Sequence, residues 1–175
     1  MSDLKLSKRL SAAASFVRDG AVCADIGTDH AYIPISLVLD GKVKYAIASD
    51  INEGPILKAR ENIEKYGLAD KITARIADGL NGIEEYKPNS IVICGMGGEL
   101  IARIINDCAY VKQQGIQLIL QPMTSIAELR EYLSTDSKFM MRILYLMRIS
   151  FTRLFAQNMM ARSIHTQAQT LKSVK

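Results

Sequence analysis

Short apolar runs alternate with amphipathic stretches along most of the 175-residue chain. Apolar residues recur at near-helical spacing over residues 5–18, which predicts an opening helix. Five apolar runs bounded by glycine or polar residues then predict strands at 21–26, 44–49, 72–77, 90–94 and 117–120. The amphipathic stretches between the runs predict helices at 31–39, 54–66, 98–105 and 125–133. Residues 78–89 are expected to form a loop or a short turn.

The order of these elements predicts the fold class. Runs that are apolar throughout are typical of strands that helices bury on both faces. Strands that alternate with helices form an open, mostly parallel sheet with right-handed crossovers. The sequence therefore predicts an α/β protein with a doubly wound, mostly parallel sheet.

Composition restricts the class of protein further. A hydrophobic fraction of 49% is that of a globular chain, and the length suits one domain with its own core. No apolar stretch approaches the roughly 18 residues of a membrane span, and the N-terminus lacks the apolar core of a signal peptide. A cytoplasmic location with no membrane partner is predicted. Cys23, Cys94 and Cys108 lack metal-ligand spacing, so no metal is predicted, and the first two are expected to be buried thiols in strands.

The turn after the first predicted strand favours one class of ligand. In such sheets ligands bind beyond the carboxyl ends of the strands, where Gly27 lets the backbone approach closely. Asp29 stands where a G-x-G-x-x-G turn would have its second glycine, so the dinucleotide fingerprint is missing. A pyrophosphate prefers bare amides, whereas an acid suits a ligand with a cationic amino-acid end. S-adenosyl-L-methionine is such a ligand.

Two further acids follow the next two predicted strands. Asp50 lies 24 residues beyond Ile26, where a carboxylate accepts hydrogen bonds from ribose hydroxyls. Asp78, followed by Gly79, can accept from the exocyclic amine of adenine. Each acid alone is equally well explained as a helix cap or a turn residue. The three together, around a glycine turn, indicate a nucleoside site.

The glycines after the fourth predicted strand and the neighbouring histidine each allow two interpretations. Residues 95–98, Gly-Met-Gly-Gly, open the fourth crossover, where an acceptor substrate would lie. A tight strand-to-helix turn explains the same glycines. His30 is the one histidine in residues 1–138 and stands beside Asp29. It is either a hydrogen-bonding support or a catalyst.

Several segments resemble the bacterial tRNA (adenine-N1)-methyltransferases that modify adenine 22. The matching segments are LSKRL at 6–10, ADIGTDHAYIPI at 24–35, ASDINEGP at 48–55, ARIADGL at 74–80, ICGMGGELI at 93–101 and LILQPMTSIAELREYL at 118–133. The resemblance implies a Rossmann-like class I methyltransferase fold, S-adenosyl-L-methionine as cofactor and tRNA as substrate. It leaves the oligomeric state open.

The resemblance also implies roles for particular residues. Asp25, Gly27, Asp29 and His30 would line the methionine end of the cofactor. Asp50 with Ile51 would meet the ribose, Asp78 with Gly79 the adenine, and Gly95 with Met96 the reacting centre. Adenine N1 is an unprotonated nucleophile at neutral pH, so transfer needs alignment more than a strong base. The candidates for a direct part in catalysis are Asp29, His30, Tyr32 and Met96, with Tyr32 a possible stacking partner for a flipped base.

The resemblance stops after Lys138. Residues 1–138 contain 16 Lys+Arg and 18 Asp+Glu, whereas residues 139–175 contain six cations and no acid. Because the basic pI rests on that tail, it is no argument for RNA binding. The family continues with an antiparallel hairpin and a helical C-terminal domain. Back-translation one frame over gives a hairpin-like string, YDENIVSYEDKFYQAICAEYDGKKHSYT.

This break leads to a hypothesis on the end of the chain. We expect a methyltransferase domain at 1–138 and an aberrant basic tail at 139–175, the product of a frameshift. The final antiparallel hairpin would then be missing or disrupted, the helical domain absent, and the edge of the fifth strand unpaired. In this form the chain is expected to methylate tRNA weakly or not at all.

Three other functions remain open from the sequence. A small-molecule or protein methyltransferase would use the same cofactor turn. A non-catalytic remnant that binds a nucleoside or RNA would fit the altered tail. A nicotinamide oxidoreductase is disfavoured by Asp29 in the glycine turn.

Overall fold

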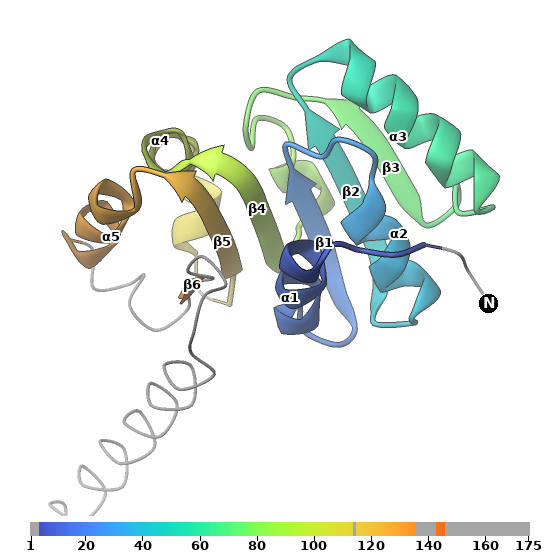
Figure 1. Cartoon of the computed structure of the whole chain (residues 1–175), viewed down its shortest axis with the longest axis horizontal. Coiled ribbons are helices and arrows are strands. Elements are labelled where there is room, and N and C mark those ends of the chain that lie inside the picture. Colours follow the sequence, from blue (N-terminus) through green and yellow to red (C-terminus); the bar gives the residue numbers. More distant parts are fainter. Residues whose placement is uncertain (1–3, 114, 136–142, 146–175) are drawn as a thin grey trace, which may run out of the picture.

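A six-stranded sheet forms the centre of the molecule (Figure 1). The computed structural model describes residues 4–113, 115–135 and 143–145. The strands have the order β3-β2-β1-β4-β5-β6, and every neighbouring pair runs parallel. Their bounds are Ala21–Ile26 for β1, Val43–Asp50 for β2, Ile72–Ile76 for β3, Ser90–Gly97 for β4, Gln117–Thr124 for β5 and Ile143–Tyr145 for β6.

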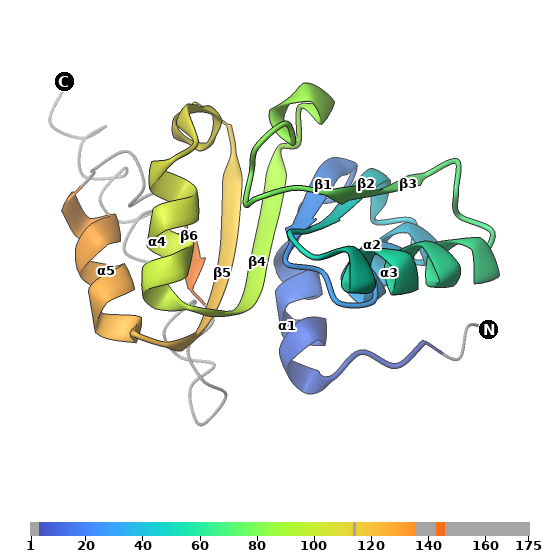
Figure 2. The same ribbon diagram turned by 90° about the horizontal axis from the view of Figure 1, so that it is seen from above.

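Helices cover both faces of this sheet (Figure 2). One face packs against α1 (Lys8–Phe16), α2 (Tyr32–Leu39) and α3 (Glu53–Lys65). The other packs against α4 (Gly98–Asn106) and α5 (Ile126–Thr135). Two 3-10 turns, η1 (Glu84–Tyr86) and η2 (Ala109–Lys112), are the remaining elements among the described residues. Alternate strand residues enter the two cores, which is why most positions of the runs are apolar. The predicted doubly wound parallel sheet is confirmed.

The predicted elements are confirmed in type, and several bounds differ. The first strand was predicted at the residues that form β1, whereas the opening helix begins at Lys8 and not at residue 5. Ser7 caps this helix, because its side chain accepts a hydrogen bond from Leu10 N at 3.3 Å. Within 78–89, expected as a loop or short turn, the structure forms the short helix η1.

Two strands, β4 and β5, extend well past their predicted carboxyl ends, and the difference matters for the site. The run Gly-Met-Gly at 95–97 was expected to begin a turn, and it continues β4. The segment Gln121–Thr124 likewise continues β5. Met96 pairs with Pro122 and Gly97 with Thr124, with register shifts on either side of Met96. Glycine and proline interrupt an apolar run, so the hydrophobic pattern in the sequence ends at these residues. The pairing between the two strands continues past them.

The sixth strand changes one expectation about the tail. Leu118–Leu120 of β5 pair with Ile143–Tyr145 in parallel. The expectation that the outer edge of β5 is unpaired is therefore wrong over these three residues. In the part of the chain that the structure describes, no strand runs antiparallel. Residues 136–142 and 146–175, on which the remaining expectations about the tail depend, lie outside the described residues.

The cysteines only partly match their predicted environment. Cys23 in β1 is buried, as expected, and burial raises the pKa of its thiol. Cys94 in β4 is only half-buried, so the expectation of a fully buried thiol is wrong there. Cys108 follows α4 and is also half-buried. Among the described helices, none is long and apolar enough to cross a bilayer.

Candidate functional site at the carboxyl edge of the sheet

Main-chain hydrogen bonds tie the carboxyl ends of β1, β2 and β3 together. The amides of Gly27 and Thr28, in the turn after β1, both donate to the carbonyl oxygen of Ser49 at 2.8 Å. The amide of Ala77, after β3, donates to the carbonyl oxygen of Asp50 at 2.9 Å. The three predicted cofactor-binding segments therefore meet at one edge, around the last two residues of β2.

The turn after β1 requires a glycine. Gly27 has φ +75°, which side chains rarely adopt, and a Cβ built there would overlap the Cε atom of Met96. Met96 in β4 therefore lies directly against the backbone of Gly27. Two residues from separate segments of the predicted site are thus in contact. The thioether is flexible, so this cover over the glycine can adapt to a ligand.

Asp25 supplies a buried carboxyl beneath this turn. It lies in β1, and the residue is 6% exposed. Burial raises the pKa of Asp25 to about 6, and a hydrogen bond with the Thr28 side chain opposes the rise. The hydroxyl of Thr28 also accepts from the amide of Ala31 at 3.1 Å. The carboxyl is therefore held within the turn and changes charge close to neutral pH.

Three of the four predicted catalytic candidates form one cluster at the start of α2. Asp29 Oδ2 lies 3.3 Å from His30 Nε2, and the Asp29 side chain is 74% exposed. The rings of His30 and Tyr32 stack with centroids 4.9 Å apart and planes 13° apart. Ala31 between them is left-handed at φ 56°, which turns the two rings to the same side. The fourth candidate, Met96, lies in β4 against Gly27.

Asp50 ends β2 with one of its carboxylate oxygens already engaged. Oδ1 accepts from the backbone amide of Asn52 at 2.8 Å and from Asn52 Nδ2 at 3.2 Å. These bonds fix the orientation of the carboxylate, and no hydrogen bond to Oδ2 is formed within the described residues. Ile51, beside it, is 59% exposed. Asn52 was not among the predicted site residues, although Asp-x-Asn is typical of a turn in which the acid accepts from the residue two positions on.

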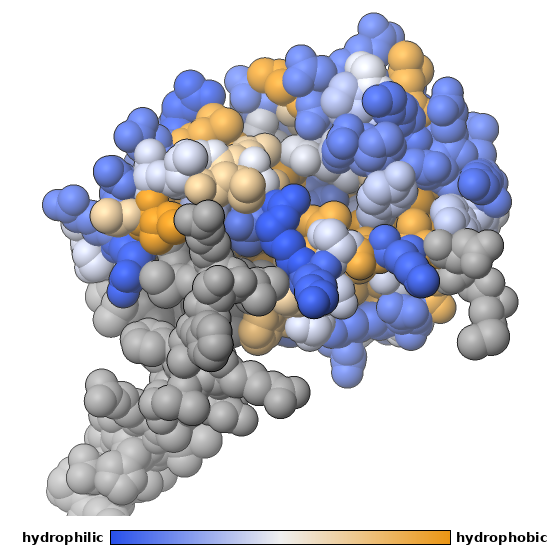
Figure 3. Space-filling view, in the orientation of Figure 1, coloured by the Kyte–Doolittle hydropathy of each residue, from blue (hydrophilic) through white to orange (hydrophobic). Residues whose placement is uncertain are grey.

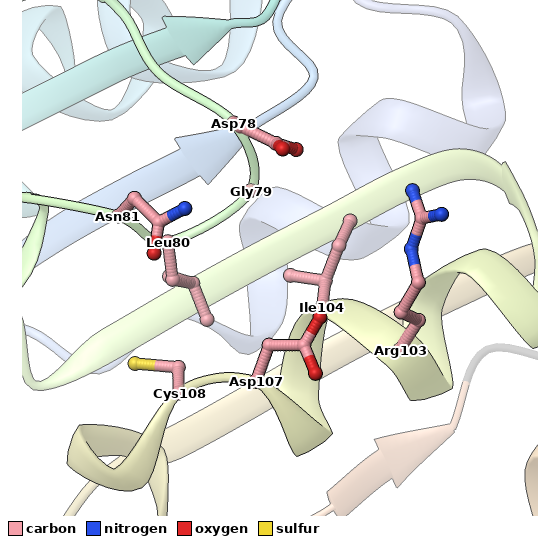
Figure 4. A pocket seen from close by; sticks show the side chains of 8 residues that line it. All are labelled: Asp78, Gly79, Leu80, Asn81, Arg103, Ile104, Asp107 and Cys108. Atoms are coloured by element: carbon pink, nitrogen blue, oxygen red, sulfur yellow. The ribbon is translucent and has the colours of Figure 1, made fainter.

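Asp78 and Gly79 border a cavity of about 220 Å³ (Figure 4). Loop residues 78–81 line it on one side, and Arg103, Ile104, Asp107 and Cys108 on the other. Gly79, at φ +59°, faces Ile104 closely, since a Cβ there would lie 3.2 Å from Cγ1. Apart from Asp78 and Gly79, no predicted site residue lines this cavity. The part that α4 plays in it could not be read from the sequence.

Gly95 lies under a side chain that the sequence analysis did not single out. A Cβ on Gly95, which has φ +83°, would lie 3.2 Å from Arg9 Nη1. Arg9 comes from α1 and reaches Gln121 of β5. The segments LSKRL and LQPM both belong to the resemblance, which was the available signal for this contact. Among the described residues, no group of three or more His, Cys, Asp or Glu is arranged to hold a metal ion.

Comparison with known proteins identifies the family. The family model described as a methyltransferase domain matches residues 6–142. The chain belongs to the methyltransferase domain family. The match includes all the strand ends described above, and at 137 of the 175 residues it leaves only the two ends of the chain outside.

Individual relatives show which methyltransferases this chain resembles. It is 46% identical over 134 residues to the tRNA (adenine(22)-N(1))-methyltransferase of Bacillus subtilis (strain 168), covering 76% of this chain and 56% of that protein. The crystal structure of the B. subtilis M1A22 tRNA methyltransferase TrmK is similar with a TM-score of 0.71 at 44% identity, covering 76% of this chain and 57% of that one. This confirms the resemblance noted in the sequence. The chain spans little more than half the length of these relatives.

A relative with a bound molecule is similar as well. The structure of M. capricolum TrmK in complex with S-adenosyl-homocysteine has a TM-score of 0.66 at 36% identity, covering 74% of this chain and 57% of that one. A precorrin-6y C5,15-methyltransferase from Geobacter metallireducens, at 20% identity and a TM-score of 0.60, shares the fold alone.

Proposed function

We propose that this chain is the catalytic domain of an S-adenosyl-L-methionine-dependent methyltransferase that modifies N1 of adenine 22 in tRNA. The observation that carries the proposal is the carboxyl edge of β1–β3, where main-chain hydrogen bonds join the Gly27 turn, Asp50 and the residue before Asp78. The 46% identity to the B. subtilis enzyme of that activity supports the choice of substrate. A metabolite or protein substrate, the alternatives on the same fold, has no comparable support.

The residues present fit this cofactor. Gly27 has no Cβ and adopts the left-handed φ of +75° that favours glycine, so the backbone can approach a ligand, and the acids Asp25 and Asp29 suit an ammonium group and not a phosphate. Asp50, with its orientation fixed by Asn52, would accept from the ribose hydroxyls, beside the exposed Ile51. Charge-assisted hydrogen bonds of this kind contribute about 1.5–3 kcal/mol each. Asp78 and Gly79 would face the adenine.

Methyl transfer to adenine N1 requires the protein mainly to align the two reactants. When bound, the cofactor supplies a methyl group on a cationic sulfur; the lone pair of adenine N1 takes the methyl carbon, and the electrons of the broken carbon–sulfur bond stay on sulfur. No proton has to leave N1. The stacked pair His30–Tyr32, with Tyr32 36% exposed, offers a planar surface for a base turned out of the tRNA. Asp29 orients His30, and Met96 covers the Gly27 turn.

Methyl transfer to a defined tRNA tests this proposal. A frame-restored chain is purified and incubated with S-adenosylmethionine and a tRNA transcript, and the digested RNA is analysed by mass spectrometry for 1-methyladenosine. A transcript with guanosine at position 22 is the matched control. We expect 1-methyladenosine only at adenine 22. Methyl transfer to free nucleosides or metabolites, and not to tRNA, would contradict the assignment.

The domain boundary at residue 138 and the frameshift hypothesis are part of this proposal. Residues 139–175 carry six cations and no acid, and the segments that resemble the adenine-22 methyltransferases all precede them. The nucleotide sequence across codon 138, in several related strains, tests the hypothesis. In the methylation assay, a frame-restored chain should transfer more methyl groups to tRNA than the 175-residue chain does. A tRNA substrate would place the protein in the cytoplasm.

A further inference from the structure

Arg9 bridges two distant parts of the chain at the carboxyl ends of β4 and β5. Its Nη1 atom donates a hydrogen bond to Gln121 Oε1 at 2.5 Å, across 112 positions of sequence. The guanidinium also lies over the backbone of Gly95, where a Cβ would be 3.2 Å from Nη1 and 3.9 Å from Nη2. Arg9 therefore occupies the acceptor side of the edge, next to the glycines of β4.

Gln121 fixes the guanidinium in place. The residue is 5% exposed, and its Nε2 atom donates to the carbonyl oxygen of Pro122 at 3.0 Å. The amide is thereby oriented with Oε1 toward Arg9. A buried amide used in this way positions a charge, because the guanidinium loses side-chain freedom before any ligand arrives.

Within the described residues, this charge has no acidic partner. The ion pairs there are His30–Asp29 and Arg75–Glu85. The positive charge of Arg9 lowers the pKa of the neighbouring Cys94 thiol, against the larger rise that burial and Asp25 cause. The pKa of Asp25 itself reflects burial and Thr28, not Arg9. A half-buried guanidinium thus keeps donors for an oxyanion.

We propose that Arg9, positioned by Gln121, binds a phosphodiester of the substrate RNA beside the reacting nucleotide. This inference rests on the proposed function. Residues 4–18 contain four cations and no acid. Arg18 donates to Gly115 O at the opposite end of β5, and Lys5 borders a groove with Asp40, which leaves the exposed Lys8 beside Arg9. Hydrophilic side chains lie over α1 in Figure 3.

A phosphodiester fits this position better than the carboxylate of the cofactor. The acids of the site, Asp25, Asp29, Asp50 and Asp78, belong to β1–β3 and the loops after them. Arg9 instead lies over Gly95 of β4 and bonds Gln121 of β5, and the exposed Lys8 precedes it in α1. The planar fork of a guanidinium matches two oxygens of a phosphate. Phosphate contacts set the position of a nucleic acid on a protein.

Salt-dependent RNA binding by the full chain tests the inference. The affinity for a tRNA transcript is measured between low and moderate salt for the wild type, Arg9→Ala, Arg9→Lys and Gln121→Leu. The affinity for S-adenosylmethionine is measured in parallel. Arg18→Ala is the matched control, an arginine at the end of the same segment whose guanidinium bonds Gly115 O at 2.8 Å. Thermal melting confirms that each variant folds.

We expect Arg9→Ala to weaken RNA binding about fivefold to tenfold at low salt and to reduce the salt slope by roughly 0.7–0.9, the loss of one phosphate contact. Arg9→Lys should keep the salt slope of the wild type and lose part of its RNA affinity. The RNA affinity of Gln121→Leu should lie between those of the wild type and Arg9→Ala. The affinity of each variant for S-adenosylmethionine, and the salt dependence of RNA binding by Arg18→Ala, should equal those of the wild type. An unchanged RNA slope in Arg9→Ala overturns the inference, and a simultaneous loss of cofactor affinity would assign Arg9 to the cofactor carboxylate. Wild-type chain that binds cofactor but not RNA also overturns it, whereas a chain that binds neither contradicts the proposed function itself.

Discussion

The two halves of the carboxyl edge use opposite chemistry. The ends of β1–β3 carry Asp25, Asp29, Asp50 and Asp78 on turns joined by main-chain hydrogen bonds. The ends of β4 and β5, Gly95–Gly97 and Gln121–Thr124, carry no charge of their own, and a cation from α1 lies over them. One half is suited to a ligand with an ammonium group and hydroxyls, the other to a polyanion. A group-transfer enzyme with such a cofactor and a nucleic-acid substrate needs both.

The largest expected effect comes from adding a methyl group at a glycine in each half, because the backbone is tightly packed at one of these glycines and open at the other. A Cβ at Gly98, the first residue of α4, would overlap the carbonyl oxygen of Ser125, whereas a Cβ at Gly54 in α3 meets open space. Gly98→Ala should lower the free energy of unfolding by about 3–4 kcal/mol, because backbone cannot move aside as a flexible side chain can. Gly54→Ala should raise it by about 0.5–1 kcal/mol. Urea denaturation checks both, and shifts of the same sign would contradict this comparison.

The second effect concerns the buried acid of the cofactor half. The pKa of Asp25 is raised by burial to about 6, above its unfolded value near 3.9. The stabilising contribution of the protonated form is therefore present below about pH 4 and is lost as the pH rises to about 6. Asp25→Asn should be more stable than wild type by about 2–3 kcal/mol at pH 8, and the difference should vanish near pH 4.

Chemical denaturation at several pH values measures this difference. Asp70→Asn, at an exposed turn, controls for the loss of a negative charge. A stability difference that does not change between pH 4 and pH 6 would show that burial does not raise the pKa of Asp25. Since an ammonium ligand favours the ionised carboxyl, S-adenosylmethionine should also bind more weakly as the pH falls below about 6.

The third effect tests the contact that links the halves, Gly27 with Met96. Gly27→Ala should weaken cofactor binding about thirtyfold, through the overlap with Met96 Cε and the left-handed φ of +75°. Gly20→Ala, at φ +72° with open space around it, carries the backbone strain alone and should leave cofactor affinity unchanged. Adding Met96→Ala to Gly27→Ala should restore part of the affinity. Calorimetry that shows equal losses for both glycines would contradict a specific role for the turn.

The smallest effect concerns a single carboxylate. Asp50→Ala should weaken S-adenosylmethionine binding by about tenfold or somewhat more, since one decade corresponds to about 1.4 kcal/mol. Asp70→Ala, remote from the strand ends, should change nothing. Equal affinity for wild type and Asp50→Ala would remove the ribose-binding role from this residue.

Local pattern predicted the cofactor half better than the acceptor half. The apolar run at 21–26 and the acids after three strands depend on neighbours in sequence, so β1 and the positions of Asp50 and Asp78 followed directly. The continuation of β4 through Met96 depends on pairing with Pro122, which no local pattern contains. The same holds for Arg9 and Gln121, 112 positions apart. The hydrogen-bond acceptor of an arginine side chain is known only when the fold shows which distant residue lies next to it.

Ring stacking and the sixth strand illustrate the same limit. His30 and Asp29 are neighbours, so their association could be anticipated, but the stack of His30 on Tyr32 needs the left-handed Ala31 between them. The sequence pattern gave no reason for Ile143–Tyr145 to pair with β5, since the strand edge, and not the composition of the segment, provides the hydrogen bonds.

Titration of the purified chain with two cofactors tests the central claim most directly. S-adenosylmethionine and NAD are titrated separately into the wild-type protein in a calorimeter at pH 7.5. The acids at the ends of β1–β3 and the missing dinucleotide fingerprint predict saturable, single-site binding of S-adenosylmethionine and no binding of NAD. Binding of NAD with equal or higher affinity, or no binding of S-adenosylmethionine to the folded chain, would contradict the account.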